Sequence, residues 1–351
     1  MQTDNRQQTT NNRQHKIAFI VPYFGKFPNY FNLWLKSAKM NPQVDVFFFT
    51  DNEEPQGLSK NIHWVKTTFA DVKARAQSLI EFPIVLDRPY KVADYRPLYG
   101  AMFQDYISDY DWWAYGDIDT IWGNLELILK RTEDEYDKIL ELGHLTLIRN
   151  NEHMNSLWHN EVEGAWTYKD AFKSDLAYHF DEGGGMSFIA KKSGCKIYSE
   201  GPGQMNFADI CPFTSQFELA YDNGDGKLPH VFTWRNGVLI GYWAKANKVE
   251  CKEYAYVHLQ KRKMQIVVDD VASENGFLIV PNKFLPLGKK DITSSFIESQ
   301  HSEAVSEVKN EQFVKRLINH LKFLKFKAKG RKRHIPLNGN EVYFGIEEAK
   351  Y

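Results

Sequence analysis

Hydrophobic residues at the start of the chain fall into short blocks of two kinds. Residues 16–21 and 44–49 are almost continuously apolar, and 62–65 is a shorter block of the same kind, as expected of strands that are buried on both faces. Residues 29–39 and 70–80 instead carry apolar positions at helical spacing. The resulting β-α-β-α-β order predicts an open α/β sheet, a fold that binds ligands at the carboxyl ends of its strands.

The following blocks predict one more helix and two more strands. The helix is expected over 97–108, because the proline at its start suits the first turn of a helix. An apolar strand over 111–115 leads directly into an Asp-x-Asp motif, and another apolar run covers 145–148. Beyond about residue 150 the sequence is richer in polar and loop-forming residues.

Composition and charge exclude several classes of protein. The net charge of −1 gives no case for nucleic-acid binding by the chain as a whole. The three cysteines have no Cys-x-x-Cys spacing, so we expect neither a disulfide framework nor a structural zinc site. The glycine-rich signatures of dinucleotide-binding and P-loop proteins are also absent.

The strongest chemical signal is Asp117-Ile118-Asp119, which closes the strand at 111–115. On extended backbone the two carboxylates point to one side while Ile118 points back into the core. Such a pair can bind a hard divalent cation, Mg²⁺ or Mn²⁺, and also reach a sugar hydroxyl. An ordinary solvated turn is the alternative interpretation.

A second signal is His258, which is followed by a basic stretch with Lys261 and Lys263. Strand alternation places His258 on the face opposite its apolar neighbours. The functional interpretation is a metal-ligating histidine with a lysine on a diphosphate. A histidine at the edge of the core beside a solvated basic loop is the alternative.

Two further groups of polar residues are candidates for sugar and phosphate contacts. Asp94 and Arg96 precede the expected helix, and an arginine can donate to both phosphates and hydroxyls; an internal salt bridge is the alternative. Asp181 and Glu182 precede a run of three glycines. They are candidate catalytic residues, either as a base for an inverting reaction or as transition-state stabilisers in a retaining one. A surface acidic turn remains the alternative for this pair.

Taken as a set, these segments resemble metal-dependent GT-A glycosyltransferases, most closely bacterial enzymes from capsule and lipopolysaccharide loci. The resemblance spans roughly residues 16–285. It rests on segments that this chain has in the following form: Pro89-Tyr-Lys91, Asp94-Tyr-Arg-Pro97, Tyr99-Gly100, Asp117-Ile-Asp119, Ile121-Trp-Gly123 and His258-Leu-Gln-Lys-Arg-Lys-Met264.

The resemblance implies a Rossmann-like nucleotide-binding sheet fused to an acceptor-binding half. It implies Asp117, Asp119 and His258 as ligands of Mn²⁺ or Mg²⁺. Donor-binding residues by the same resemblance are Tyr23, Asp51, Lys91, Asp94, Arg96, Asp117, Lys261 and Lys263. The implied donor is a UDP-hexose, with galactose as the first choice, and the implied acceptor is a surface polysaccharide or lipopolysaccharide glycan. Retention of the anomeric configuration is favoured, because retaining families share the late histidine.

The expected domain organisation follows from these assignments. Residues 1–14 are polar and predict a disordered leader that lacks the apolar core of a secretory signal. A GT-A catalytic domain is expected over 15–265, with its nucleotide-sugar half at 15–125 and its acceptor half at 126–265. Residues 266–351 are expected to form a C-terminal extension.

The extension contains a basic segment at 309–334 with ten lysines and arginines against one acidic residue, Glu311. Its apolar residues fall on one stripe, which predicts an amphipathic helix. Such a helix suits a cytoplasmic protein that contacts the anionic inner membrane peripherally. A helix docked on the catalytic domain is the alternative. For the whole chain, the competing hypotheses are a sugar nucleotidyltransferase and a non-catalytic glycan-binding protein.

Overall fold

The computed structural model describes residues 15–201, 203–212, 214–220, 224–268, 276–288, 291–304 and 347–348. The expected leader at 1–14 and the basic helix at 309–334 lie outside these residues. Among the described residues, no helix has both the length and the apolar character that a membrane span requires.

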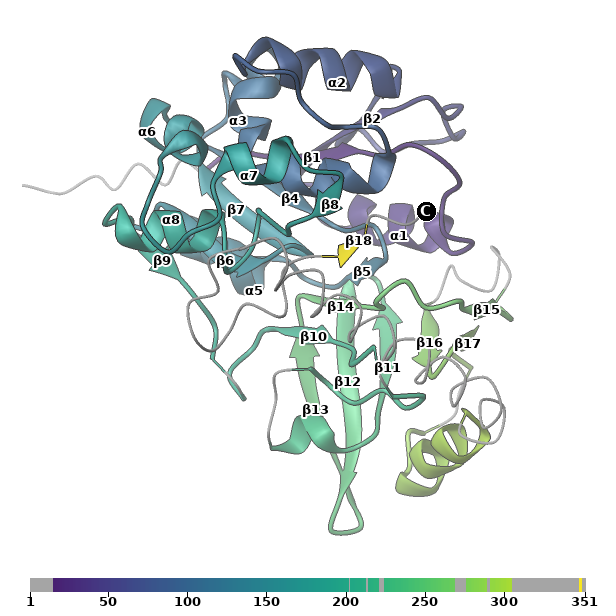
Figure 1. Ribbon diagram of the computed structural model, residues 1–351. Helices are drawn as coiled ribbons and strands as arrows, with labels where there is room; N and C mark the ends of the chain where they lie inside the picture. The colour runs from purple at the N-terminus through teal and green to yellow at the C-terminus, as the bar shows by residue number, and fades with distance from the viewer. Residues whose placement is uncertain are drawn as a thin grey trace, which may run out of the picture.

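A seven-stranded mixed sheet forms the upper part of the molecule (Figure 1), in the order β3-β2-β1-β4-β7-β6-β9. Strands β3, β2, β1 and β4 are parallel, whereas β7 runs antiparallel to both β4 and β6. The open α/β sheet expected from the apolar blocks is therefore confirmed. The strand bounds are β1 Ile17–Pro22, β2 Val44–Thr50, β3 Ile62–Lys66, β4 Trp112–Gly116, β6 Lys138–Leu142, β7 Leu145–Arg149 and β9 Ile197–Tyr198.

Both faces of this sheet are covered, which explains why its central strand β1 is apolar along its whole length. In β1, Ala18 and Ile20 belong to one buried cluster while Ile17, Phe19 and Val21 belong to another. The second cluster is covered by α1 Phe31–Lys39 and α5 Glu126–Leu129, and η2 Lys130–Glu133 follows α5 directly. The first is covered by α2 Phe69–Ser78, η1 Pro89–Leu98, α3 Tyr99–Met102, α4 Gln104–Ile107, α6 Glu152–Ser156, η3 Leu157–His159, α7 Tyr168–Phe172 and α8 Met186–Lys192.

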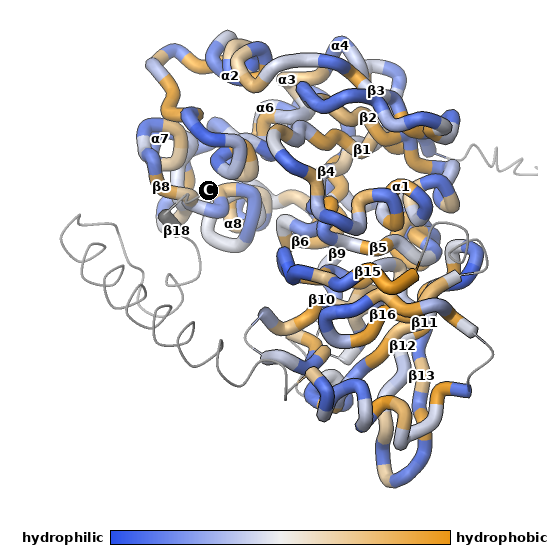
Figure 2. The backbone as a smooth tube through the Cα atoms, turned by 90° about the vertical axis from the view of Figure 1, so that its right-hand side faces the viewer, coloured by the Kyte–Doolittle hydropathy of each residue, from blue (hydrophilic) through white to orange (hydrophobic). Residues whose placement is uncertain are grey.

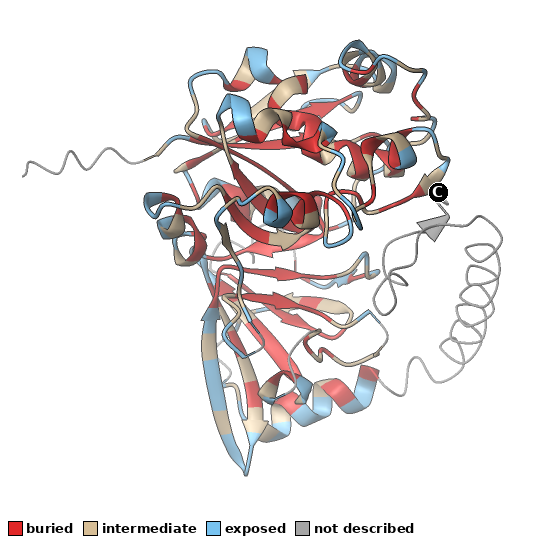
Figure 3. Ribbon diagram, turned by 60° about the vertical axis from the view of Figure 1, so that its left-hand side comes forward, coloured by how far each residue is buried: buried red, intermediate tan, exposed pale blue. Residues whose placement is uncertain are grey.

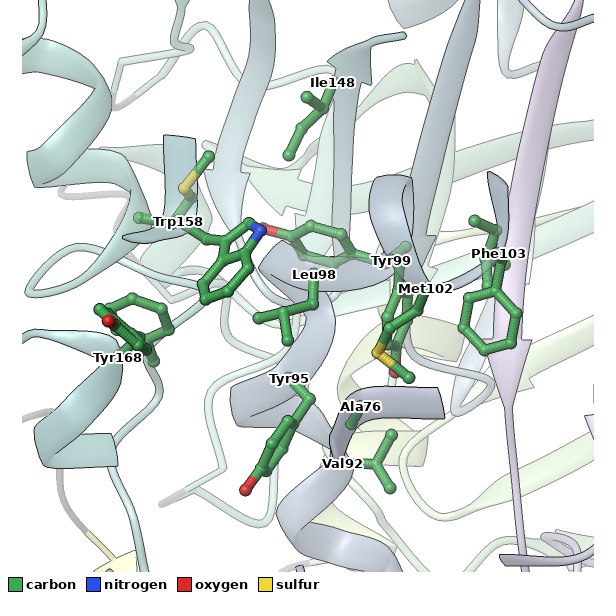
Figure 4. Packing of buried hydrophobic residues seen from close by; sticks show 14 of the residues in the cluster. Ala76, Val92, Tyr95, Leu98, Tyr99, Met102, Phe103, Ile148, Trp158 and Tyr168 are labelled. Atoms are coloured by element: carbon green, nitrogen blue, oxygen red, sulfur yellow. The ribbon is translucent and has the colours of Figure 1, made fainter. Parts of the chain in front are cut away.

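The single helix expected over 97–108 is instead three short elements. Pro97 lies inside the 3₁₀ helix η1 rather than at a helix start, and it has no backbone N–H to donate. The non-helical Phe103, with φ −118°, then separates α3 from α4. Large side chains from this region still form one core (Figure 4), in which Tyr95, Leu98 and Tyr99 lie near Trp158 of η3.

A six-stranded sheet forms the lower part, in the order β13-β12-β11-β16-β17-β15. Its bounds are β11 His230–Arg235, β12 Val238–Lys245, β13 Lys248–Tyr254, β15 Gln265–Ile266, β16 Phe277–Val280 and β17 Lys283–Pro286. The expected domain boundary after residue 265 is wrong, because it cuts through this sheet. Phe277 and Phe284 share a buried cluster with Phe232 and Trp234, so β16 and β17 complete the domain rather than extend it.

A three-stranded sheet, β10-β14-β5, lies between these two parts (Figure 1). Its bounds are β5 Thr120–Trp122, β10 Phe207–Asp209 and β14 Tyr256–His258. Alternate residues face opposite ways: Trp122 and Tyr256 pack into the upper core, whereas Ile121 and Val257 pack into the lower one. This small sheet therefore fixes the two larger sheets to each other through its buried side chains.

The remaining elements are peripheral to this arrangement. A helix over 294–304 packs through Ile297 against Val231 of β11. The short β8 Leu176–Ala177 pairs with β18 Glu347–Glu348, and η4 Asp225–Lys227 precedes β11. Figure 3 shows buried residues along the strands of the sheets, and Figure 2 shows that many of these segments are hydrophobic.

Candidate functional site

The candidate site lies at the edge of the upper sheet, at the point where the order in which strands are added reverses. The chain adds β2 and β3 on one side of β1 and then returns to add β4 on the other side. Open α/β sheets bind ligands at such a switch point, beyond the carboxyl ends of the strands. Tyr23 follows β1 and Asp117 follows β4, so both lie at this edge.

Asp117 and Asp119 converge there with His258. Both carboxylates approach Nε2 of His258, Asp119 Oδ1 to 3.3 Å and Asp117 Oδ2 to 3.8 Å. The three ligand atoms lie within 4.8 Å of one another. Ile118, between the two aspartates, is buried in the upper core, as the alternation predicts.

Strand pairing explains how residues so distant in sequence meet. The Asp-x-Asp segment links β4 to β5, and β5 pairs with β14 so that Thr120 lies opposite His258. The main chain beyond His258 then closes on Asp119. The Leu259 N–H donates to the Asp119 carbonyl at 2.8 Å, and the Lys261 N–H donates to Asp119 Oδ2 at 2.5 Å.

The charge around His258 is strongly negative. Its Nδ1 contacts Asp209 Oδ1 at 2.8 Å, while its Nε2 faces Asp117 and Asp119. Burial alone would lower the pKa of His258, but Asp119 and Asp209 raise it well above its ordinary value. The carboxylates of Asp209, Asp117 and Asp119 around its two ring nitrogens therefore favour the protonated imidazole.

Arg96 connects this cluster to the glycine-rich turn. One guanidinium nitrogen, Nη2, donates to Asp117 Oδ1, and the other, Nη1, donates to Asp181 Oδ2 at 2.9 Å. Nη1 also donates to the Gly143 carbonyl at 2.9 Å. The structure therefore brings Arg96 and Asp181, both candidates from the sequence, into direct contact.

The two carboxylates that share Arg96 have pKa values shifted in opposite directions. Burial favours the neutral form of Asp117, yet Arg96, His258 and Lys261 together lower its pKa. For Asp181, burial prevails over Arg96 and raises the pKa. Asp181 Oδ1 is also buried without a hydrogen-bond partner among the described residues. A pair of carboxylates with pKa values shifted in opposite directions is typical of a reacting centre.

Glu182 lies beside Asp181 and is held there by a main-chain N–H group. The Gly143 N–H donates to Glu182 Oε1 at 2.9 Å. Gly143 thus lies between three charged side chains and contacts all of them closely, which explains the absence of a side chain at this position.

Substituting this glycine tests the tight packing of the site. A Cβ on Gly143 would lie 2.8 Å from Glu182 Oε1 and 2.9 Å from both Arg96 Nη1 and Asp181 Oδ2, so the charged groups must move apart. We expect Gly143→Ala to lower turnover by roughly 10²-fold, since small misplacements of catalytic groups have effects of that size. Gly201→Ala is the matched control, because no atom lies within 4 Å of its added Cβ. Equal activity of the two variants would contradict this packing.

Lys91 and Asp94, which the sequence predicts as donor contacts, bond instead to each other and to main-chain groups of the protein. Both are buried, at 2% and 1% exposure, and their charged atoms lie 2.5 Å apart. The Lys91 ammonium also donates to the Ala171 and Leu176 carbonyls. Asp94 accepts the N–H groups of Tyr178 and Phe180. All their bonding capacity is used inside the protein, where they anchor the segment that ends at Asp181.

The other expected donor contacts lie around the site. Tyr23 is half-buried and its hydroxyl donates to the Lys26 carbonyl at 3.0 Å. Asp51 is exposed at the end of β2. The Lys261 ammonium lies 4.1 Å from the centre of the Tyr90 ring, and Lys263 is exposed nearby in sequence. Their roles in binding a nucleotide sugar stay predictions.

Asp209 is the functional candidate that sequence reasoning missed. It ends β10 and lies beside His258 in the parallel pairing of β10 with β14. Its only local signal is an aspartate after the two apolar residues of a short strand, a pattern too common to select. His144, in the turn before β7, is also buried against His258, with ring centres 4.8 Å apart.

Comparison with known proteins places the chain in a family without assigning its activity. Residues 19–288 match the model of a family of unknown function, DUF6625, and the chain belongs to that family. No curated protein matches the chain. A glycosyltransferase involved in the glycosylation of the major capsid of PBCV-1 is 8% identical, with a TM-score of 0.30 over 55% of this chain and 84% of that chain. A likeness at this TM-score is too slight to assign a fold or an activity.

Proposed function

We propose that this member of the DUF6625 family is a metal-dependent glycosyltransferase that uses a nucleotide sugar. One observation carries the proposal: Asp117, Asp119 and His258 converge at the switch point of the parallel strands, with ligand atoms within 4.8 Å of one another. Two carboxylates and one imidazole are a ligand set for Mn²⁺ or Mg²⁺. Asp117 is 29% exposed, which leaves this side of the set open to a substrate.

The chemistry of the donor explains why a cation is needed. A nucleotide sugar releases a nucleoside diphosphate, and a bound cation supplies Lewis-acid neutralisation of that leaving group. Asp117, Asp119 and His258 would hold the cation, and Lys261 or Lys263 would contact the diphosphate. Tyr23 and Asp51, at the ends of β1 and β2, would contact the base and ribose. The proposed donor is a UDP-hexose, with UDP-galactose as the first candidate.

The opposite side of the site suits the reacting sugar. Asp181 Oδ1 is buried and has no partner among the described residues, so it can accept a hydrogen bond from a sugar hydroxyl. Arg96 fixes Asp181 relative to Asp117, and the Gly143 N–H orients Glu182. Retention, which the sequence resemblance favours, would need Asp181 or Glu182 to stabilise an oxocarbenium-like transition state. If Asp181 acts as a base instead, the configuration inverts.

The acceptor we propose is a growing surface polysaccharide or lipopolysaccharide glycan. This choice comes from the sequence resemblance, as does peripheral contact of the 309–334 segment with an anionic membrane.

The proposal is tested by measuring the thermal stability of the full chain with a panel of nucleotide sugars, with and without Mn²⁺. A ligand at 100 times its Kd stabilises the native state by about 2.7 kcal/mol. We expect UDP-hexoses to raise the midpoint only when Mn²⁺ is present, and the stabilising donor to be slowly hydrolysed. Stabilisation by UTP with synthesis of a UDP-sugar would replace the proposal with a nucleotidyltransferase. Stabilisation by glycans alone would replace it with a glycan-binding protein.

A further inference from the structure

Asp209 is buried beside His258 and contacts Nδ1, the ring nitrogen opposite the one that faces Asp117 and Asp119. It is 3% exposed and ends β10, while His258 ends the neighbouring strand β14. The two residues are register partners in a parallel pair. Their side chains therefore lie on the same face of the three-stranded sheet and meet there.

The hydrogen bonds of Asp209 determine which nitrogen of His258 carries a proton. Asp209 Oδ1 lies 2.8 Å from His258 Nδ1 and accepts from the Gln260 side-chain amide at 2.6 Å. A carboxylate oxygen can only accept here, so Nδ1 of His258 donates. The lone pair needed to bind a cation is then at Nε2, the nitrogen that faces Asp117 and Asp119.

We propose that Asp209 is a positioning residue that holds His258 in the Nδ1–H form, with Nε2 directed at the cation. This inference rests on the proposed metal site and adds a residue that acts through its ligand. The ring plane is fixed at the same time. His144 packs 4.8 Å from the His258 ring and is itself held by Tyr256, whose hydroxyl lies 2.8 Å from His144 Nδ1.

The backbone around Gln260 supports this arrangement. Gln260 and Lys261 both have left-handed backbone conformations, with φ of 55° and 56°. Residues other than glycine rarely adopt this conformation, and two in succession are unfavourable. The turn directs the side-chain amide of Gln260 to Asp209 and the backbone N–H of Lys261 to Asp119. This strained turn therefore fixes two carboxylates. One is Asp119, a proposed metal ligand, and the other is Asp209, which contacts the imidazole of His258.

A competing site shares two of these residues. His144, Asp209 and His258 also offer three ligand atoms within 4.8 Å of one another. All three residues are buried, however, so a substrate diphosphate has no access to a cation among them. Asp209 Oδ1 already accepts two hydrogen bonds, and two imidazoles with one carboxylate are a poorer set for a hard cation than two carboxylates with one imidazole.

The experiment measures Mn²⁺ binding to the full chain by electron paramagnetic resonance, without any nucleotide sugar. We expect Asp209→Leu to weaken Mn²⁺ binding by about 10- to 100-fold, the usual effect of removing a partner of a ligating histidine. Asp209→Asn should lose less, because its amide oxygen can still accept from Nδ1. Asp45→Asn is the matched control: Asp45 contacts His63 at 3.0 Å in an exposed pair far from the site.

Nitrogen NMR of histidine-labelled protein adds a readout that a merely structural role would not change. We expect the Nδ1–H form of His258 in the wild type with Mg²⁺, and a shift toward the other form in Asp209→Leu. Unchanged Mn²⁺ affinity and tautomer in Asp209→Leu would overturn the positioning role alone. No Mn²⁺ binding by the wild type would instead overturn the proposed function. If His144→Gln weakens Mn²⁺ binding as much as Asp209→Leu while Asp117→Asn does not, the cation occupies the competing site and both assignments fail.

Discussion

Asp119→Asn should abolish most metal-dependent activity while leaving the fold intact. The substitution removes one anionic ligand from the proposed cation site, and cation stabilisation of a diphosphate leaving group is worth several kcal/mol. We therefore expect a loss of roughly 10³-fold in Mn²⁺-dependent nucleotide release from the donor. An asparagine oxygen can still accept the hydrogen bond from the Lys261 N–H, so the 259–261 turn should persist.

Measuring stability and activity in the same variant distinguishes a loss of the fold from a loss of metal binding. The unfolding midpoint of Asp119→Asn without metal should stay close to that of the wild type, and Mn²⁺ should no longer raise it. Asp45→Asn, which changes an aspartate beside a histidine on the surface, should behave as the wild type in both assays. Full Mn²⁺-dependent activity in Asp119→Asn would remove this carboxylate from the metal site.

The largest effect on stability is expected at Asp94. Removing one partner of a buried ion pair leaves the other charge uncompensated, which lowers the free energy of unfolding by about 3–5 kcal/mol. Asp94→Leu also removes the acceptor for the N–H groups of Tyr178 and Phe180. We expect the variant to unfold at a clearly lower urea concentration. Activity should also fall, because the segment that carries Asp181 loses its anchor.

Two controls identify burial of the charge as the cause. Arg131 and Asp134 have the same i, i+3 spacing as Lys91 and Asp94 but are 37% and 47% exposed. Asp134→Leu should therefore lower stability by less than about 1 kcal/mol. The double variant Lys91→Met with Asp94→Leu should regain part of the lost stability, since no unpaired charge remains. Equal losses in Asp94→Leu and Asp134→Leu would show that burial of the pair has no energetic consequence.

The sequence predicts the upper sheet well because its strands are buried on both faces. Such strands are apolar at nearly every position, as in β1 and β2, and the helices between them show clear helical spacing. The strands of the lower sheet carry a weaker signal. β13 is mostly exposed, and β16 is only four residues long, so neither could be assigned before the pairing was seen. This is why the boundary at residue 265 was misplaced.

The sequence predicts those residues of the candidate site whose type and position alone indicate metal binding. Two aspartates after a buried strand, followed late in the chain by a histidine, identified three side chains that the structure brings together. Long-range pairing was not predictable. Nothing near Asp94 indicates that it accepts the N–H groups of Tyr178 and Phe180, and nothing near Asp209 indicates that β10 lies beside β14. These contacts depend on strand and loop packing that spacing along the chain does not encode.

The most direct test of the account is the position of the cation itself. Anomalous diffraction from a crystal of the full chain grown with Mn²⁺ and UDP locates manganese independently of any assumption about activity. We expect one strong peak within coordination distance of Asp117, Asp119 and His258 Nε2, on the side that faces the diphosphate. A peak between His144, Asp209 and His258 Nδ1, or no peak at either position at saturating Mn²⁺, would contradict it.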